Sequence, residues 1–230
     1  MRKHIPNTLT CLNLFSGCIG ILFVLKGEFL FAFYCVVASG IFDFLDGMVA
    51  RLLGVKSTIG KELDSLADVI SFGFLPGAVL YKLLEVSTGH IYLPYLGFVI
   101  TAFSALRLAK FNVDERQTSE FIGLNTPMNT FFIMSLPFIG EVHPAWIYQP
   151  WVLLVIVAIV SFLLISEIRL FSMKLSSLMW SENKFRYIFL FISIVLLFAL
   201  QFLALPLILL SYFIFSQLHF KVQRQQDKYR

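Results

Sequence analysis

Long runs of apolar residues alternate with short polar links along the whole chain. A helix needs about 20 residues to cross the hydrocarbon core of a bilayer. Each apolar run therefore predicts one membrane helix, although the fifth and sixth runs are short. The pattern predicts an all-α, polytopic transmembrane bundle of about eight helices, six in a core and two at the C-terminus. The runs lie at about residues 8–25, 29–53, 61–84, 92–112, 127–140, 150–166, 187–203 and 205–220.

The composition supports a membrane protein. Hydrophobic residues make up 58% of the 230 residues and charged residues 14%, whereas a soluble domain averages about 25% charged residues. The mean hydropathy of +0.83 argues against a soluble helical bundle. The formal charge of +4 does not indicate nucleic acid, because basic residues in a membrane protein report its orientation.

The basic residues predict how the chain crosses the membrane. If the N-terminus lies in the cytoplasm, 16 of the 18 Lys and Arg residues fall on the inside, and only Lys26 and Lys82 fall outside. By the positive-inside rule, both termini are expected in the cytoplasm. The start "MRKH" resembles a signal peptide, but its apolar run continues past Cys18 to Leu25 and predicts a first membrane helix. The three cysteines lie in apolar runs and suggest neither a disulfide framework nor a metal-thiolate site.

Four carboxylates interrupt the second and third predicted helices. At about 100° per residue, each pair of aspartates falls on one face of its helix, together with small residues. The short link between the two helices suggests that they are antiparallel neighbours, so all four carboxylates are expected to meet in the cytoplasmic third of the membrane. These residues are Asp43, Asp46, Asp64 and Asp68.

Such a cluster predicts a metal site. One charged residue at the centre of a membrane helix costs about 2.5–3.5 kcal/mol on insertion scales, and neighbouring like charges force protons onto each other. A divalent cation removes both problems. Carboxylate ligands without His or Cys favour Mg²⁺, Mn²⁺ or Ca²⁺ over Zn²⁺, and four of them allow two ions that clamp phosphate oxygens.

The spacing of this stretch resembles a known signature. The pattern Asp43-xx-Asp46-Gly47-xx-Ala50-Arg51-x8-Gly60-xxx-Asp64-xxx-Asp68 matches every fixed position of the CDP-alcohol phosphatidyltransferase family. The resemblance implies an integral membrane enzyme that transfers a phosphatidyl group from CDP-diacylglycerol to an alcohol and releases CMP. It implies one domain over residues 1–230, with a catalytic core at about 1–170 and a C-terminal helical pair at about 187–220.

The resemblance also implies roles for individual residues. It suggests Asp43, Asp46 and Asp64 as ligands of two Mg²⁺ or Mn²⁺ ions, and Asp68 as the general base that also touches the second metal. Taken by themselves, Asn7 and Thr10 could equally cap a helix, Arg51 could extend to the interface, and Gly54 suggests helix packing. The residues expected to bind CDP are Asn7, Thr10, Gly47, Ala50, Arg51, Thr58 and Gly60.

Three further stretches resemble the phosphatidylserine synthase branch of the family: "LADVISFGFLPG", "ALRLAKFN" and "FIGLNTPMNT". Lys110 and Asn125 differ from the usual residues of that branch at these positions. L-serine is the expected acceptor, and Arg107 could pair with its carboxylate or with an aspartate of the cluster. Thr126 and Pro127 could also mark only a helix start. The residues expected to bind the acceptor are Arg107, Lys110, Asn112, Thr126 and Asn129.

Two other functions stay open at this point. Glycerol 3-phosphate or inositol phosphate would need several cations, and Arg107, Lys110 and Arg116 offer them. A cation- or proton-coupled transporter would also contain buried carboxylates. The expected partners are CDP-diacylglycerol, L-serine, the lipid bilayer and a second copy of the chain in a homodimer, with no nucleic acid. The expected location is the inner membrane of a bacterium, with the active site facing the cytoplasm.

Overall fold

The computed structural model describes residues 4–55, 57–114, 120–172 and 179–228. Eight long helical segments confirm the all-α bundle, and the short helix α7 joins two of them. The elements are α1 (His4–Leu25), α2 (Phe29–Leu52), α3 (Thr58–Asp68), η1 (Val69–Phe74), α4 (Leu75–Ser87), η2 (Leu93–Phe98), α5 (Val99–Val113), β1 (Glu120–Ile122), α6 (Thr126–Val142), α7 (Pro144–Ile147), α8 (Pro150–Ile165), β2 (Arg169–Phe171), α9 (Trp180–Leu200), η3 (Gln201–Leu203) and α10 (Ala204–Lys228).

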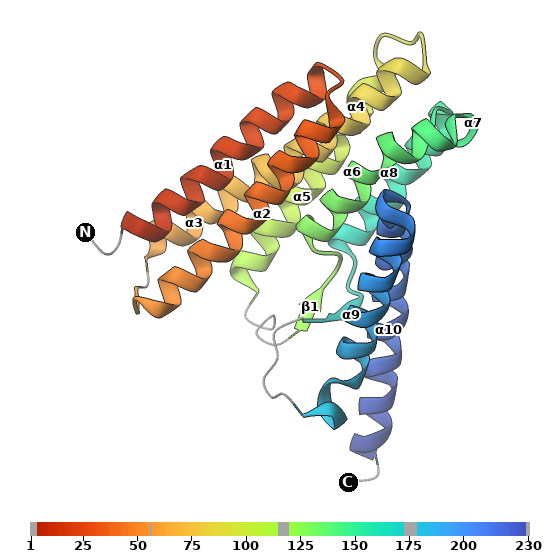
Figure 1. Cartoon of the computed structure of the whole chain (residues 1–230). Helices are drawn as coiled ribbons and strands as arrows, with labels where there is room; N and C mark the ends of the chain where they lie inside the picture. Colours follow the sequence, from red (N-terminus) through yellow and green to blue (C-terminus); the bar gives the residue numbers. More distant parts are fainter. Residues whose placement is uncertain (1–3, 56, 115–119, 173–178, 229–230) are drawn as a thin grey trace.

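The helices form one bundle with a hairpin beside it (Figure 1). Helix α1 packs along α2, α3 and α4, while α5 packs against α8 and η1. Helices α9 and α10 lie side by side, and α10 also contacts α6 (Figure 1). Within the described residues, five helical stretches are long and apolar enough to cross a membrane, so the chain is an integral membrane protein. They are His4–Leu25, Phe29–Leu52, Thr58–Ser87, Leu93–Val113 and Asn183–Gln223.

The second and third predicted helices are not the close neighbours that their short link suggested. Helix α1 packs against both α2 and α3, whereas α2 and α3 have little direct backbone contact. Gly54 turns the chain between them with a φ of +63°, while the amide of Val55 donates to the carbonyl of Ala50 at 3.0 Å. This is a glycine helix cap. A Cβ atom at Gly54 would meet no other group within 4 Å, so the packing role suggested for Gly54 is wrong. The cavity of the candidate site is lined by residues of α1, α2 and α3.

Residues 58–87 form one continuous helical stretch with a change of winding in the middle. The segment η1 is a π-helix that directly follows Asp68. Pro76 has no amide hydrogen, so the carbonyl of Phe72, four residues earlier, loses its usual backbone donor. The Thr130 hydroxyl of α6 lies within donating distance of that carbonyl, at 2.9 Å, and shares its hydrogen with the carbonyl of Thr126 in its own helix, also at 2.9 Å. A side chain from another helix thus satisfies the carbonyl group at the change of winding.

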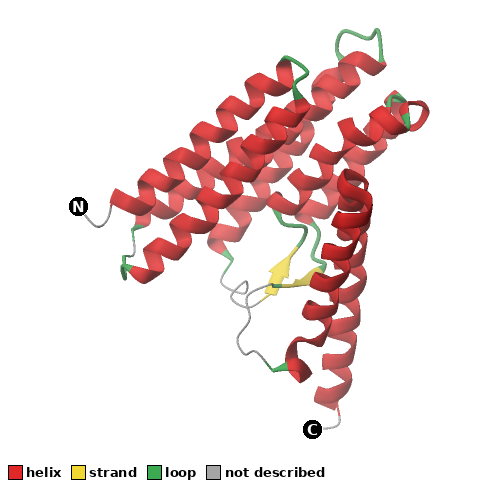
Figure 2. Ribbon diagram, in the orientation of Figure 1, coloured by secondary structure: helices red, strands yellow, loops and turns green. Residues whose placement is uncertain are grey.

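A two-stranded antiparallel sheet was not expected from the sequence (Figure 2). Strands β1 and β2 pair Glu120 with Phe171 and Ile122 with Arg169. Each strand has only three residues, too few for an alternating pattern to show in the sequence. Gly123 follows β1 with a φ of +74°, and a Cβ atom there would lie 2.7 Å from the carbonyl oxygen of Leu164. Only glycine allows the strand to pass so close to the end of α8.

We predict that Thr130→Val destabilises the fold. Valine has nearly the shape of threonine but cannot donate to the Phe72 carbonyl, so the buried link between α6 and η1 is lost. The expected loss in the free energy of unfolding is about 1–2 kcal/mol, measured by denaturant unfolding in detergent. The matched control is Thr8→Val, since the exposed Thr8 hydroxyl donates only to the carbonyl of His4 in its own helix. Equal stability of the two variants would contradict the prediction.

Candidate active site

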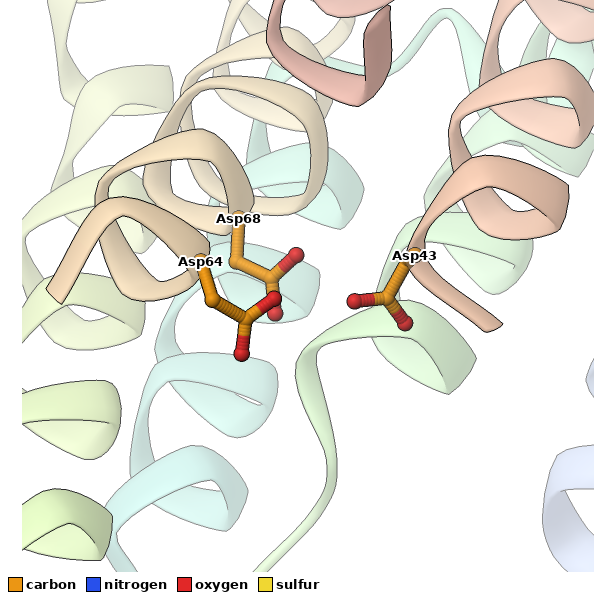
Figure 3. A group of neighbouring side chains, drawn as sticks. All are labelled: Asp43, Asp64 and Asp68. Atoms are coloured by element: carbon orange, nitrogen blue, oxygen red, sulfur yellow. The ribbon is translucent and has the colours of Figure 1, made fainter. Parts of the chain in front are cut away.

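Three of the four predicted carboxylates converge across the space between α2 and α3. Asp43 extends from α2, and Asp64 and Asp68 extend from successive turns of α3 toward it (Figure 3). Carboxylate oxygens of all three residues lie within 4.8 Å of one another. The spacing of four residues places Asp64 and Asp68 on one face of α3. Helix α1 packs against both α2 and α3 and so fixes the two helices that carry the carboxylates.

The fourth carboxylate, Asp46, has a different environment. The Thr10 hydroxyl of α1 donates to Asp46 Oδ2 at 2.5 Å and is itself almost fully buried. Asp46 does not belong to the three-carboxylate group but lines the adjoining cavity. Thr10 lies within α1 rather than at its end, so the interpretation of Thr10 as a helix cap is wrong. Three of the four predicted carboxylates thus form one group, and the sequence did not predict the hydrogen bond between Thr10 and Asp46.

Asn13 is a contact of the cluster that the sequence analysis missed. Its side-chain amide donates to Asp68 Oδ1 at 3.2 Å, and Asn13 is fully buried. The backbone carbonyl of Asn13 accepts hydrogen bonds from the hydroxyls of Ser39 at 3.1 Å and Ser71 at 3.0 Å. One signal was available, because a lone asparagine in an apolar membrane helix is costly unless it is paired. Three helical segments thus fix the residue that orients Asp68.

A cavity of about 240 Å³ opens beside the carboxylates. Five of the residues predicted to bind CDP line it: Asn7, Thr10, Gly47, Ala50 and Gly60. A Cβ atom at Gly47 would meet no other group within 4 Å, so the absence of a side chain leaves open space there. Asp46 and Asp64 lie in the same wall. The cavity therefore joins the small-residue faces of α2 and α3 to the acidic cluster.

Two of the predicted CDP contacts lie apart from this cavity. Arg51 and Thr58 are exposed and do not belong to its described lining, although both flank the turn between α2 and α3. Lys61, which was not predicted, lines the cavity instead, and its ammonium group donates to the carbonyl of Asn112 at 2.8 Å.

The chemistry of the cluster fits a divalent cation. Asp64 Oδ1 is buried and has no hydrogen-bond partner among the described residues. The described ion pairs do not include Asp43, Asp46, Asp64 or Asp68. Buried carboxylates of this kind need a compensating positive charge, and oxygen ligands suit hard cations. Asp43, Asp64 and Asp68 are the residues that could hold the metal.

Other buried polar side chains lie on α5 and on α6. Arg107 is 7% exposed and its Nε atom has no partner among the described residues. Asn129 is fully buried, and both polar atoms of its side chain also lack a described partner. Thr126 is 1% exposed. Asn125, not Thr126, caps α6, because its side chain accepts from the amide of Met128 at 2.8 Å. Thr126 and Pro127 do mark the start of α6, as one interpretation of the sequence suggested, but the capping side chain belongs to Asn125.

The other two predicted acceptor contacts bind neighbouring residues. Asn112 donates to the Ser65 hydroxyl at 2.7 Å and so joins α5 to α3. The Lys110 ammonium group lies 3.6 Å from Glu167 in a largely exposed pair. Lys110 and Arg107 still line one small cavity together with Ile122 and Ser166. Arg116, considered for a phosphorylated acceptor, lies outside the described residues.

Comparisons with known proteins agree with this site. A family model described as CDP-alcohol phosphatidyltransferase matches residues 3–158. The chain belongs to this family. CDP-alcohol phosphatidyltransferases use divalent metals, which agrees with the acidic cluster. The match spans α1 to most of α8, so α9 and α10 lie beyond it.

Several relatives share the name CDP-diacylglycerol–serine O-phosphatidyltransferase. The protein of Helicobacter pylori (strain ATCC 700392 / 26695) is 32% identical over 197 residues, which are 83% of this chain and 80% of the relative. That of Bacillus subtilis (strain 168) is 30% identical over 171 residues, 73% of this chain and 89% of the relative. That of Methanocaldococcus jannaschii is 36% identical over 130 residues, 56% of this chain and 58% of the relative. The predicted family is confirmed.

We predict that Asp64→Asn weakens metal binding. The variant removes one charge from a cluster that takes part in none of the described ion pairs. Loss of a residue that merely orients a ligand costs about 10–100-fold in metal affinity, so loss of a ligand should cost at least about tenfold. Titration of the purified protein with Mn²⁺, followed by electron paramagnetic resonance, measures the affinity. Glu62→Gln is the matched control, because Glu62 is an exposed carboxylate on the same helix. Equal Mn²⁺ affinities of the two variants would exclude Asp64 as a ligand.

Proposed function

We propose that this protein transfers the phosphatidyl group from CDP-diacylglycerol to L-serine, forming phosphatidylserine and CMP. The observation that carries the proposal is the convergence of Asp43, Asp64 and Asp68 beside a cavity walled by Gly47 and Gly60. Such a cavity suits a nucleotide whose phosphates approach the carboxylates. The shared name of the relatives supports serine as the acceptor.

The acidic residues would hold the metal. We propose two Mg²⁺ or Mn²⁺ ions, with Asp43, Asp64 and Asp68 as ligands of at least one and Asp46 available to the other. When bound, these ions supply positive charge for the pyrophosphate of the substrate and for the departing CMP. The Thr10 hydroxyl would fix the orientation of Asp46 through its 2.5 Å hydrogen bond. Asn7, Thr10, Gly47, Ala50 and Gly60 would surround the CDP moiety.

Asp68 is proposed as the general base. Asn13 occupies Asp68 Oδ1, which leaves Oδ2 to accept the proton of the serine hydroxyl. The serine oxygen then bonds to the lipid-side phosphorus while the bond from that phosphorus to the oxygen of CMP breaks. CMP leaves with the bonding electrons, and the proton stays on Asp68 until solvent removes it. Such a transfer depends on positioning and on charge stabilisation more than on covalent chemistry.

The acceptor would bind on the other side of Asp68, against α5 and α6. Arg107 is close enough to Asp68 to interact with it electrostatically, and its unpaired Nε atom could donate to the serine carboxylate. Asn129 offers an amide donor and a carbonyl acceptor without partners, so it could receive the serine ammonium group. Thr126 lies one turn earlier on α6. Lys110 and Asn112 would contribute only at the edge of this pocket, because they already bind Glu167 and Ser65.

The membrane setting follows from the same reasoning. We propose that both termini and the active site face the cytoplasm and that the protein lies in the inner membrane of a bacterium. The basic residues near the helix ends support this orientation. A homodimer is proposed on the family resemblance and the small-residue helix faces. One catalytic domain is proposed over residues 1–230, with the pair α9 and α10 at the end of its core.

Release of CMP from CDP-diacylglycerol tests the function. Purified protein with Mg²⁺ or Mn²⁺ should release CMP when L-serine is added, and D-serine, ethanolamine and glycerol serve as controls. Release with glycerol 3-phosphate or inositol phosphate, and not with serine, would assign a phosphorylated acceptor. No release with any alcohol would remove the transferase function and support ion transport, which flux measurements in vesicles would then detect.

We predict that Asp68→Asn lowers kcat by at least about 100-fold, since a positioned general base contributes about 10²–10⁴-fold. Binding of CDP-diacylglycerol, measured by calorimetry in detergent, should change little, because the cavity is walled mainly by other residues. Glu62→Gln again provides a carboxylate control on α3. If Asp68→Asn instead abolishes binding of the lipid, Asp68 is an essential metal ligand rather than the base.

A further inference from the structure

We propose that the C-terminal hairpin of α9 and α10 positions the acceptor side of the active site through β2. This inference rests on the proposed function. The family match ends at residue 158, so it assigns no role to this hairpin. Tyr212 and Ser216 of α10 are the positioning residues, and they act on the pocket of Arg107 and Asn129 through the backbone of β2 and β1.

Helix α10 binds the outer edge of β2. The Tyr212 hydroxyl donates to the carbonyl of Phe171 at 2.8 Å, and the amide of Phe171 donates to the Ser216 hydroxyl at 3.3 Å. Gln217 donates to the carbonyl of Arg169 at 3.1 Å. Tyr212 and Ser216 are four residues apart, so they lie on one face of the helix. Both are buried, and they supply the hydrogen bonds that the strand edge would otherwise lack.

Strand β2 in turn pairs with β1, which lines the small cavity beside Arg107. It pairs with β1 so that Arg169 lies opposite Ile122, and Ile122 lines the same cavity as Arg107. The next residue, Gly123, donates its amide to the carbonyl of Ile168 at 2.9 Å. The chain then reaches the Asn125 cap of α6. The path from β2 to the first turn of α6, which contains Thr126 and Asn129, is therefore short and hydrogen-bonded.

Tyr212 also packs against β2 through its ring. The ring lies edge-on against Phe171, with the centroids 5.2 Å apart. Met128 of α6 and Phe213 of α10 pack against both hydrophobic clusters, that of the main bundle and that of the hairpin. The hairpin is thus part of the packing behind the pocket.

The hairpin is anchored at its far end as well. Phe202, at the turn between α9 and α10, stacks on Phe138 of α6 with centroids 3.8 Å apart. It also meets Phe33 of α2 edge-on at 5.0 Å. Two fixed points, one at the turn and one at β2, hold α10 along α6 (Figure 1). A hairpin that only sealed the bundle against lipid would not need hydrogen bonds to a strand.

Removing the contacts to β2 should affect the acceptor and spare the lipid substrate. With the Tyr212 or Ser216 hydroxyl gone, Phe171 keeps its place in β2 but loses a partner on its outer edge. Ile122, which lines the cavity beside Arg107, and the first turn of α6 are then expected to become more mobile. The CDP cavity is lined by α1, α2 and α3 and shares none of these residues. The two substrates should therefore respond differently.

The experiment compares steady-state kinetics of CMP release in Tyr212→Phe, Ser216→Ala and the wild type. The KM for serine should rise about threefold to tenfold in each variant, the effect of one lost hydrogen bond, while the KM for CDP-diacylglycerol stays unchanged. Ser216→Thr keeps a hydroxyl and should restore the wild-type KM for serine. Ser211→Ala is the matched control, because Ser211 is on the same helix but donates only to the carbonyl of Ile208 at 2.8 Å.

Several outcomes would overturn the inference. An unchanged KM for serine in folded Tyr212→Phe and Ser216→Ala would remove the positioning role. Equal increases in both KM values, with a lower melting temperature, would make the hairpin a general stabiliser. If the wild type releases CMP only with another alcohol, the serine assignment fails, and the KM for that alcohol tests the hairpin in the same variants. If no alcohol gives CMP, both the function and the inference are wrong.

Discussion

The structure depends on bringing several carboxylates together inside an apolar chain. Asp43, Asp64 and Asp68 lie within 4.8 Å of one another, where their mutual repulsion and lost hydration oppose folding. Nothing in the hydrophobic pattern stabilises such a group. Uncharged donors compensate in part, from Thr10 to Asp46 and from Asn13 to Asp68. The remaining unpaired oxygen of Asp64 is consistent with a site completed by a cation, as in a family that uses divalent metals.

Helix α1 explains how the carboxylates can face one another. It packs beneath both α2 and α3 and keeps them apart at the cavity. It also supplies the two polar side chains that reach the aspartates, Thr10 and Asn13. A Cβ atom at Gly17 of α1 would lie 2.9 Å from the Cα atom of Ser71, so close packing on the π-helix requires glycine. The first helix is therefore part of the site as well as a membrane span.

The change of winding after Asp68 adds a second constraint. Pro76 removes a donor from the helix, and Thr130 on α6 replaces it. The residue before Thr130 is Asn129, whose buried polar atoms lack a described partner and which is proposed to bind the acceptor. The same turn of α6 thus contacts the helical stretch that carries Asp68 and contains a proposed acceptor residue.

The sequence by itself determined the membrane bundle and the acidic signature. Both are local patterns: apolar length fixes a span, and a spacing of three or four residues fixes a helix face. Only the tertiary structure decided the rest. Asn13 and Asp68 are 55 residues apart in the chain, and Phe171 and Tyr212 are 41 residues apart. The periodicity of the sequence does not predict contacts between residues so far apart. The position of α1 between α2 and α3, the three-residue strands and the donors to β2 depend on which faces pack together, and that choice is made by the whole bundle.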